Sequence, residues 1–325
     1  MDIASWLAVR PEAPLILLAA LVLDALAGDP LGRAHPVALL GRLIAALDRR
    51  LNRPERGDAA RRARGILVVL VVVGLAAGVG ALVYRLARAF AWGWLVELVF
   101  VATLIAQHSL FVHVRRVAAA LDREGLEGGR RAVARIVGRD VATLDAHGVA
   151  RGAIESTAEN FADGVVAPAF WYLVLGPAGI AAYKAVNTLD SMIGHREARY
   201  RDFGRCAARL DDAANWLPAR LAALLIMLAA LFVPYASPAR AVTTALRDSG
   251  KHASPNAGWP EAALAGALDL ALNGPRSYAG VSGTQPWVGS GRARATTADI
   301  RRALYLFAIA CLLNAALVVA LTAVI

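Results

Sequence analysis

An apolar run without a polar side chain extends from Gly65 to Val83 and constrains the fold more than any other feature of this sequence. The hydrocarbon core of a bilayer is about 30 Å thick, and a helix crosses it with roughly 20 apolar residues. Of the 325 residues 58% are hydrophobic, whereas about 45–50% is usual in soluble domains. The sequence therefore predicts an all-α, polytopic integral membrane protein with amphipathic helices, in which re-entrant helices are an open alternative to further spans.

The predicted membrane segments fall into two groups within one membrane-embedded domain, residues 1–325. Spans are expected near residues 14–27, 65–83, 90–112 and 303–325. Two less regular apolar segments, interrupted or flanked by proline and glycine, are residues 165–182 and 217–235. They either cross the bilayer or re-enter it, since irregular backbone at membrane depth is tolerated where protein or water covers it. For the first segment a cleaved signal peptide is the alternative, which the acidic residues ahead of it disfavour.

The distribution of charge predicts the sidedness of the loops. The formal net charge is +10, and residues 30–64 alone contain nine arginines against three acidic residues. Basic loops of membrane proteins are retained in the cytoplasm, so this segment and the larger polar loops 113–164 and 236–302 are predicted to be cytoplasmic. The side on which residues 184–215 lie is left open. Aromatic residues are not interleaved with the basic runs, which argues against a nucleic-acid partner.

One acidic residue, Glu97, lies well inside a predicted span. A carboxylate at the bilayer centre costs about 2.5–3.5 kcal/mol on insertion scales, so we expect this side chain to face protein or water. Because Glu97 comes near the start of its segment, an interfacial position is favoured.

Three acidic side chains follow one another at helical spacing between the apolar segments. Glu155, Glu159 and Asp163 stand at i, i+4 and i+8, and on a helix they lie within an arc of about 80°. Such a row repels itself unless a cation lies between the carboxylates, and a hydrated Mg²⁺ held by one or two of them would serve. The sequence leaves a metal site and a solvated acidic helix face as equal alternatives.

Two further polar clusters follow within sixty residues. Lys184, Asn187 and Asp190 share the polar face of an amphipathic helix. They are either a surface ion pair, which would contribute well under about 1 kcal/mol, or a phosphate-binding lysine beside a metal-binding aspartate. Asp211 and Asn215 then place an acid and an amide on one helical turn. Three such clusters close together favour a functional site.

Two Gly-rich stretches lie near the end of the chain. Lys251 follows a Ser-Gly turn whose backbone N–H groups suit phosphate, although Ala245 breaks the spacing of a Walker A loop. Residues 280–291 are predicted to be a flexible loop.

Taken together, these motifs closely resemble the CobD/CbiB family, the adenosylcobinamide-phosphate synthases of cobalamin biosynthesis. The resemblance rests on LAGDP at 26–30, HPV at 35–37, ESTAEN at 155–160, DGVVAP at 163–168, YKAVNTLDSM at 183–192, ARLDD at 208–212, Asn215, PAR at 218–220 and SPNAG at 254–258. The motifs occur in family order along nearly the whole chain. Trp259 stands where the family pattern has tyrosine.

The resemblance implies an integral enzyme of the cell inner membrane. Such enzymes join a propionate carboxylate of adenosylcobyric acid to aminopropanol, or its phosphate, through an amide bond, giving adenosylcobinamide or its phosphate. ATP is implied as co-substrate and Mg²⁺ as cofactor. The expected partners are the small-molecule substrates adenosylcobyric acid and aminopropanol phosphate, the lipid bilayer and other late enzymes of the cobalamin pathway. The oligomeric state is left open, as is the phosphorylation of the amine.

On this hypothesis the polar clusters take three kinds of role. The catalytic residues are Glu155, Glu159, Lys184 and Asp211. The residues that bind substrate or phosphate are Asn160, Asn187, Arg220, Asn215, Lys251 and Asn256. The metal ligands are Glu159, Asp163 and Asp190. The alternative is a non-enzymatic membrane sensor or transporter on the same scaffold, because broken spans and intramembrane polar groups also suit transport.

Overall fold

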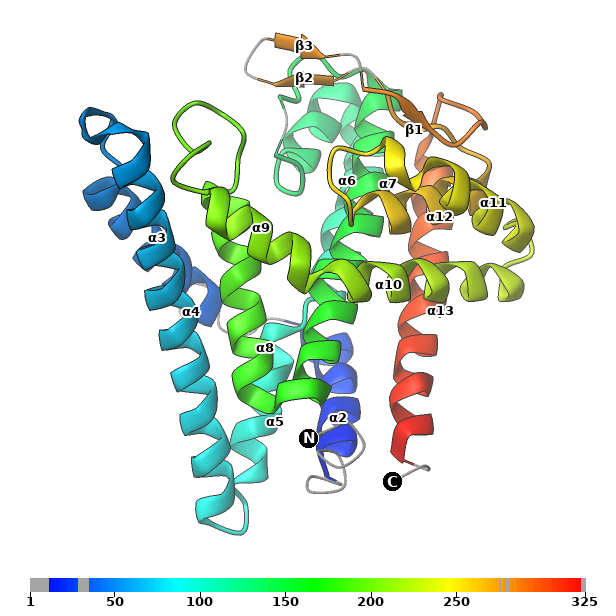
Figure 1. Cartoon of the computed structure of the whole chain (residues 1–325). Helices are drawn as coiled ribbons and strands as arrows, with labels where there is room; N and C mark the ends of the chain where they lie inside the picture. Colours follow the sequence, from blue (N-terminus) through cyan, green and yellow to red (C-terminus); the bar gives the residue numbers. More distant parts are fainter. Residues whose placement is uncertain are drawn as a thin grey trace. The chain divides into compact units, whose positions relative to one another are not determined.

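The computed structural model describes residues 12–28, 35–138, 140–274, 276–278, 281–283 and 285–322. Helices dominate it, which confirms the all-α prediction, and the described strands form two small two-stranded sheets. The chain divides into two compact units. Unit 1 comprises residues 1–106, 167–215 and 318–325, and unit 2 comprises residues 107–166 and 216–317. Figure 1 labels their elements, and each unit is described by itself.

Unit 1 is a helical bundle organised around two long helices. Its elements are α2 (Ala13–Ala27), α3 (Pro36–Leu51), η2 (Pro54–Arg56), α4 (Gly57–Ala89), α5 (Trp94–Leu104), α8 (Ala167–Ile193) and α9 (Arg205–Ala214). Helices α4 and α8 run side by side (Figure 1). Gly80 makes this possible, because a Cβ atom at that position would collide with the backbone of Pro177. Small residues serve this purpose in membrane bundles, where backbones must approach closely to pack.

Helix α8 is interrupted in its middle. Gly176 has φ 66°, and Pro177, which follows it, has no N–H to donate. A positive φ costs little for glycine but is rarely adopted by other residues. The Gly-Pro pair that makes segment 165–182 irregular in sequence therefore divides α8 into an apolar first half and a second half that carries Lys184, Asn187 and Asp190.

Unit 2 is built around helix α12 (Gly258–Leu268), which is buried along almost its whole length. The other helices of this unit are α6 (Gln107–Val133), α7 (Ala146–Phe161), the π-segment η3 (Ala162–Val166), α10 (Trp216–Ala229), η4 (Ala230–Phe232), α11 (Pro238–Asp248), η5 (Ser249–Lys251) and α13 (Thr297–Thr322). Gly266 lets α11 lie close to α12, since a Cβ atom there would meet the carbonyl of Arg240. The core of unit 2 is thus formed by α12 with α7, α10 and α11 around it.

Short antiparallel strands occur near the Gly-rich stretch. Strand β1 (Leu272–Asn273) pairs with β4 (Trp287–Val288), and β2 (Arg276–Tyr278) pairs with β3 (Val281–Gly283). The prediction of a loop over residues 280–291 was therefore wrong for β3 and β4. Their partners lie earlier in the chain, and glycine content alone does not reveal such pairing.

In the part of the chain that the structure describes, four helical stretches are long and apolar enough to cross a membrane. They are Pro54–Ala89, Trp94–Val133, Ala146–Ile193 and Thr297–Leu321. A bent pair, Arg205–Ala214 with Trp216–Phe232, would be a fifth if the two helices are taken together across their 47° bend. The predicted span 14–27 corresponds to α2, a shorter apolar helix. These helices confirm a polytopic membrane protein.

Glu97 faces the interior of unit 1. Its side chain is 1% exposed and accepts a hydrogen bond from the hydroxyl of Tyr172 at 2.7 Å. The guanidinium of Arg88 donates to the other carboxylate oxygen at 3.3 Å. The expectation that Glu97 faces protein is therefore confirmed, and its partners come from α4 and α8.

Candidate functional site

The residues predicted to form the site belong to both units. Unit 1 contains Lys184, Asn187, Asp190, Asp211 and Asn215. Unit 2 contains Glu155, Glu159, Asn160, Asp163, Arg220, Lys251 and Asn256.

In unit 1 a chain of hydrogen bonds joins the second half of α8 to α9. The hydroxyl of Tyr183 donates to Oδ1 of Asn215 at 2.9 Å, and Nδ2 of Asn215 donates to Oδ2 of Asp211 at 3.1 Å. The amide of Asn187 donates to the other oxygen of Asp211 at 3.5 Å. Tyr183, Asn215 and Asp211 are all buried. We call these four residues the Asp211 network, and it holds one carboxylate in a fixed orientation.

The environment of Asp211 changes its acidity. Helix α9 lies outside the four long spanning stretches, and burial there raises the pKa of Asp211 to about 7, with a further contribution from the negative charge of Asp190. The amides of Asn215 and Asn187 act in the opposite direction, because they donate to the ionised form. A carboxyl group with a pKa near neutral pH can both accept and release a proton under physiological conditions.

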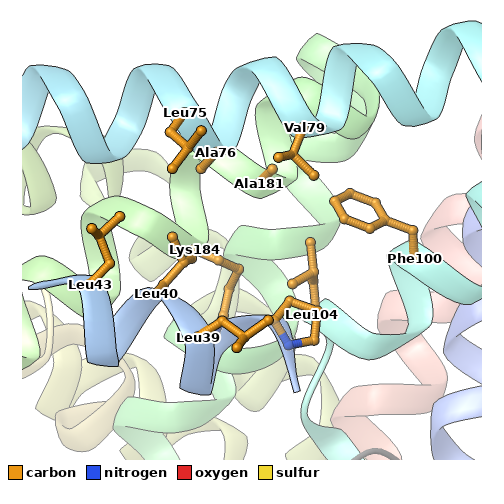
Figure 2. Close-up of a pocket in the computed structure, with 11 residues that line it drawn as sticks. Leu39, Leu40, Leu43, Leu75, Ala76, Val79, Phe100, Leu104, Ala181 and Lys184 are labelled. Atoms are coloured by element: carbon orange, nitrogen blue, oxygen red, sulfur yellow. The ribbon is translucent and has the colours of Figure 1, made fainter. Parts of the chain in front are cut away.

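Lys184, which follows Tyr183 in the sequence, lines an apolar pocket of unit 1 (Figure 2). The pocket has a volume of about 230 Å³ and lies between α3, α4, α5 and α8. Its other lining residues are Pro36, Leu39, Leu40, Leu43, Leu75, Ala76, Val79, Phe100, Leu104 and Ala181. A lysine keeps its aliphatic stem on apolar surface while its ammonium reaches a polar neighbour. The pocket wall is therefore almost entirely apolar, and Lys184 contributes to it mainly through its aliphatic stem.

In unit 2 the predicted row of carboxylates is divided between two environments. Glu155 is 4% exposed and its Oε1 accepts the backbone N–H of Asn273 at 2.7 Å, so it anchors strand β1. Glu159 is exposed and Asp163 is half-buried. Asp163 lies in the π-segment η3 that continues α7, and π-segments occur often at functional sites. Asn160 lies beside them and donates to the carbonyl of Ser156 at 2.9 Å.

A Mg²⁺ ion that arrives with a phosphate ligand stays a prediction for Glu159 and Asp163. Within the described ranges no group of three or more His, Cys, Asp or Glu side chains is placed to hold a metal. Mg²⁺ commonly takes only one or two protein carboxylates and completes its shell with water and substrate phosphates. Glu159 and Asp163, four residues apart, can supply such a pair. Asp190, the third predicted ligand, belongs to the other unit.

Arg220 of unit 2 is held by aromatic and polar neighbours. Its guanidinium donates to the carbonyl of Trp216 at 2.6 Å and to Oδ1 of Asn256 at 3.4 Å. It also lies over the rings of Trp216 and Trp259, 4.3 and 5.0 Å from their centroids. An arginine fixed in this way loses little side-chain freedom when it binds an anion. The sequence could indicate the contact with Trp216, which is one helical turn from Arg220. It did not reveal the contact with Trp259, which is distant in the chain.

A second set of contacts near Asn256 was also missed. Glu261 on α12 is 1% exposed, and its Oε1 lies 3.5 Å from Nε2 of His252. A buried carboxylate beside an imidazole can exchange a proton with it. The only sequence indication was the acidic residue in the first turn of an otherwise apolar helix.

Lys251 has a close partner within its own loop. Its ammonium lies 2.7 Å from Oδ1 of Asp248, which is fully buried. Asp248 also binds the guanidinium of Arg247 at 2.7 Å and the N–H of Gly289 at 2.8 Å. The hydrogen bond from Arg247 is the main cause of a pKa of Asp248 well below its usual range. Lys251 thus helps to fix the η5 turn, and phosphate binding by it stays a prediction.

Comparison with known proteins agrees with the resemblance seen in the motifs. A family model described as CobD/Cbib protein matches residues 17–307. A "Cobalamin biosynthesis protein CobD" from Sinorhizobium sp is 52% identical over 314 residues, covering 94% of this chain and 97% of the relative. A protein of the same name from Rhizobium meliloti (strain 1021) is 50% identical over 307 residues, covering 92% and 94%. One from Rhodobacter capsulatus is 47% identical over 276 residues, covering 84% of each chain. No solved structure matches.

Proposed function

Since this chain belongs to the CobD/Cbib protein family, we propose that it is a ligase of cobalamin biosynthesis in the cell inner membrane. It forms an amide between a propionate carboxylate of adenosylcobyric acid and aminopropanol or its phosphate, with ATP as co-substrate and its larger polar loops in the cytoplasm. The names of the relatives supply the pathway. The reaction is inferred from the family resemblance and from the chemistry of the polar clusters.

The observation that carries the proposal is the Asp211 network. Asp211 is buried, and each of its two carboxylate oxygens accepts a hydrogen bond from a different amide, Asn187 or Asn215. A purely structural aspartate on an amphipathic helix would more often face solvent and be paired with a cation. A carboxylate oriented in this way is suited to take a proton from a substrate amine, since geometry must place the base within hydrogen-bond reach.

The chemistry requires two steps. A carboxylate is a poor acyl electrophile, so a carboxylate oxygen of adenosylcobyric acid first attacks the γ-phosphorus of ATP. ADP is displaced from that phosphorus, and an acyl phosphate forms. The amine nitrogen then attacks the acyl carbon, inorganic phosphate leaves, and the proton lost by nitrogen passes to Asp211. Only the neutral amine can attack, which is why a base is needed.

The other residues have supporting roles. Lys184 is a candidate for binding phosphoryl oxygens, and Asn187 and Asn215 orient the base. In unit 2, Arg220 and Asn256 are candidates for phosphate binding, and Glu159 and Asp163 would hold Mg²⁺. Bound Mg²⁺ would neutralise charge on the nucleotide phosphates.

A coupling assay tests the proposal. Purified full-length protein would receive adenosylcobyric acid, ATP, Mg²⁺ and either aminopropanol or its phosphate, and mass spectrometry would detect the amide. We expect product that depends on ATP, and at least a hundredfold loss of rate in Asp211→Asn. Asp212→Asn, which removes the neighbouring charge from α9 outside the Asp211 network, is the matched control and should retain most activity.

Two results would count against the ligase. The first is a folded wild-type protein that gives no amide with either amine. The second is binding of adenosylcobyric acid without turnover, which would favour the sensor or transporter alternative.

A further inference from the structure

A basic pocket lies on α6 in unit 2, apart from all the residues assigned above. It has a volume of about 350 Å³, and its polar lining consists of His113, Arg116, Arg123, Glu124, Arg131 and Arg135. We propose that this α6 pocket binds a phosphate-bearing anion. The proposal does not depend on the ligase reaction, because the pocket shares no residue with the groups that the reaction uses.

The shape of the pocket comes from glycines within α6. Gly125 has φ 69° and bends the helix, so that the segment after the bend turns against the segment before it. Gly128 lies at the contact, where a Cβ atom would collide with the Cβ of Glu124 and lie 3.2 Å from the carbonyl oxygen of Ala120. Arginines from both sides of the bend therefore line one concave surface that is open to solvent.

The charge of the pocket is strongly positive. Four arginines face a single carboxylate, Glu124, which is already bound by Arg131 at 2.8 Å. Nδ1 of His113 donates to the carbonyl of Ser109 at 2.6 Å, so Nε2 is the nitrogen of this ring that remains for a ligand. The side chains of Arg116, Arg123 and Arg135 are exposed.

These three arginines differ from the others of unit 2. Within the described residues the guanidinium groups of Arg116, Arg123 and Arg135 form no hydrogen bond or ion pair. The remaining arginines of unit 2 whose side chains are described each have a carboxylate, carbonyl, histidine or aromatic partner: Arg115, Arg130, Arg131, Arg151, Arg220, Arg240, Arg247, Arg292, Arg294, Arg301 and Arg302. The arginines without such a partner are thus gathered in one concave site, which is the arrangement expected of an anion-binding pocket.

The ligand chemistry follows from the guanidinium groups. Arginine presents a planar fork of donors that matches phosphate oxygens, and several arginines together suit a group with a charge of about −1.5 to −2. Two sources can supply it. One is a soluble phosphate compound. The other is the headgroup of an anionic phospholipid, since α6 continues the spanning stretch that begins at Trp94 and basic residues after a span meet the lipid phosphates.

Arginine modification with phenylglyoxal tests the proposal on the intact protein. Full-length protein in nanodiscs of neutral phosphatidylcholine would be modified with and without inorganic pyrophosphate, and peptide mass spectrometry would give the rate at each arginine. In a second arm the nanodiscs would contain about one third phosphatidylglycerol and no pyrophosphate. Arg115, adjacent in sequence but outside the pocket, and Arg302 serve as internal controls.

We expect modification of Arg116, Arg123 and Arg135 to slow at least fivefold in one arm, while the two controls change less than twofold. Protection by pyrophosphate identifies a soluble ligand, and protection only by phosphatidylglycerol identifies a lipid headgroup. Equal rates in all three conditions would overturn the proposal.

A pair of variants provides a second readout. In the triple variant Arg116→Gln/Arg123→Gln/Arg135→Gln, we expect the affinity for the anion identified by the first experiment to fall at least tenfold. Arg115→Gln/Arg240→Gln/Arg302→Gln removes the same charge elsewhere and should change it less than threefold. An equal loss of affinity in both variants would show that binding depends only on the net charge of the protein, and would overturn the proposal of a specific pocket.

Discussion

The hydroxyl of Tyr183 donates a hydrogen bond to Oδ1 of Asn215 at 2.9 Å and thereby determines which end of that amide faces Asp211. As a donor the phenol O–H takes the carbonyl oxygen of the amide, and the amide nitrogen is left to donate to Asp211, whose ionised carboxylate can only accept. Tyr183 is therefore a positioning residue: it acts on the carboxylate of Asp211 through two successive hydrogen bonds, with Asn215 between them.

Tyr183→Phe should reduce coupling more than it reduces stability. The ring and its packing remain, and the loss of one hydrogen bond costs about 0.5–1.5 kcal/mol of folding free energy. With the amide no longer fixed, we expect kcat to fall about tenfold with little change in KM. Tyr172→Phe is the matched control, because it removes the bond to Glu97 instead, and its kcat should stay within twofold of wild type. Equal losses of kcat would contradict the assigned role.

Asp211 should make stability depend on pH near neutrality. Its pKa is raised to about 7, whereas an unfolded aspartate has a pKa of about 3.9. The stabilisation is fully present below about pH 4 and is lost as the pH rises through 7, because the folded state must give up a proton that it holds more tightly. Asp211→Asn removes this dependence. The difference in melting temperature, variant minus wild type, should therefore increase as the pH is raised from 5 to 8.

Asp202→Asn is the control for that series. The hydrogen bond from Arg62 lowers the pKa of Asp202, so its contribution is present above the unfolded pKa and is lost only in more acidic solution. Thermal unfolding in detergent should therefore show a constant offset from wild type between pH 5 and pH 8. A constant offset for Asp211→Asn as well would show that its carboxyl group does not titrate in that range.

Glycine at position 80 should be essential for packing of α4 on α8. In Gly80→Ala the new methyl group meets the backbone of Pro177, which cannot move aside as a flexible side chain would, and we expect a loss of about 1–3 kcal/mol. Gly78→Ala on the same helix has nothing within 4 Å of the added atom and should be neutral or slightly stabilising. Reversible unfolding in mixed micelles would measure both, and similar values would argue against a close contact.

Lys251→Met should distinguish a structural from a substrate-binding lysine. If the ion pair with Asp248 is its main function, the variant loses stability while the KM for ATP is unchanged. If it also binds phosphate, KM for ATP should rise about tenfold or more. Arg247→Met removes the other cation from Asp248. It is the control that shows how far KM for ATP changes when only the structure of the η5 turn is disturbed.

Composition and periodicity were sufficient to predict a helical, polytopic membrane protein, because a bilayer dictates the length and polarity of the helices that cross it. The same patterns placed Lys184, Asn187 and Asp190 on one helical face. They did not reveal partners distant in sequence: Tyr183 meets Asn215 and Glu155 meets Asn273. Helical spacing is a local property, whereas such pairs depend on how whole helices pack.

The row of three carboxylates illustrates the limit. Periodicity gave Glu155, Glu159 and Asp163 equivalent positions, yet Glu155 is buried against β1 and Glu159 is exposed. Which member of a row is buried depends on the element that packs across it. In this case that element is a short strand, a feature that a search for apolar runs does not find.

The polar second half of α8 affects how the protein can be made. A segment that carries Lys184 and Asp190 partitions poorly into lipid on its own, by about 2.5–3.5 kcal/mol for each charge at the bilayer centre. Chain order provides for this, because α4 is synthesised before α8 and α9 follows directly after it. The ribosome therefore delivers the polar segment when one protein partner is already in place, and biogenesis of this region depends on assembly rather than on hydrophobicity.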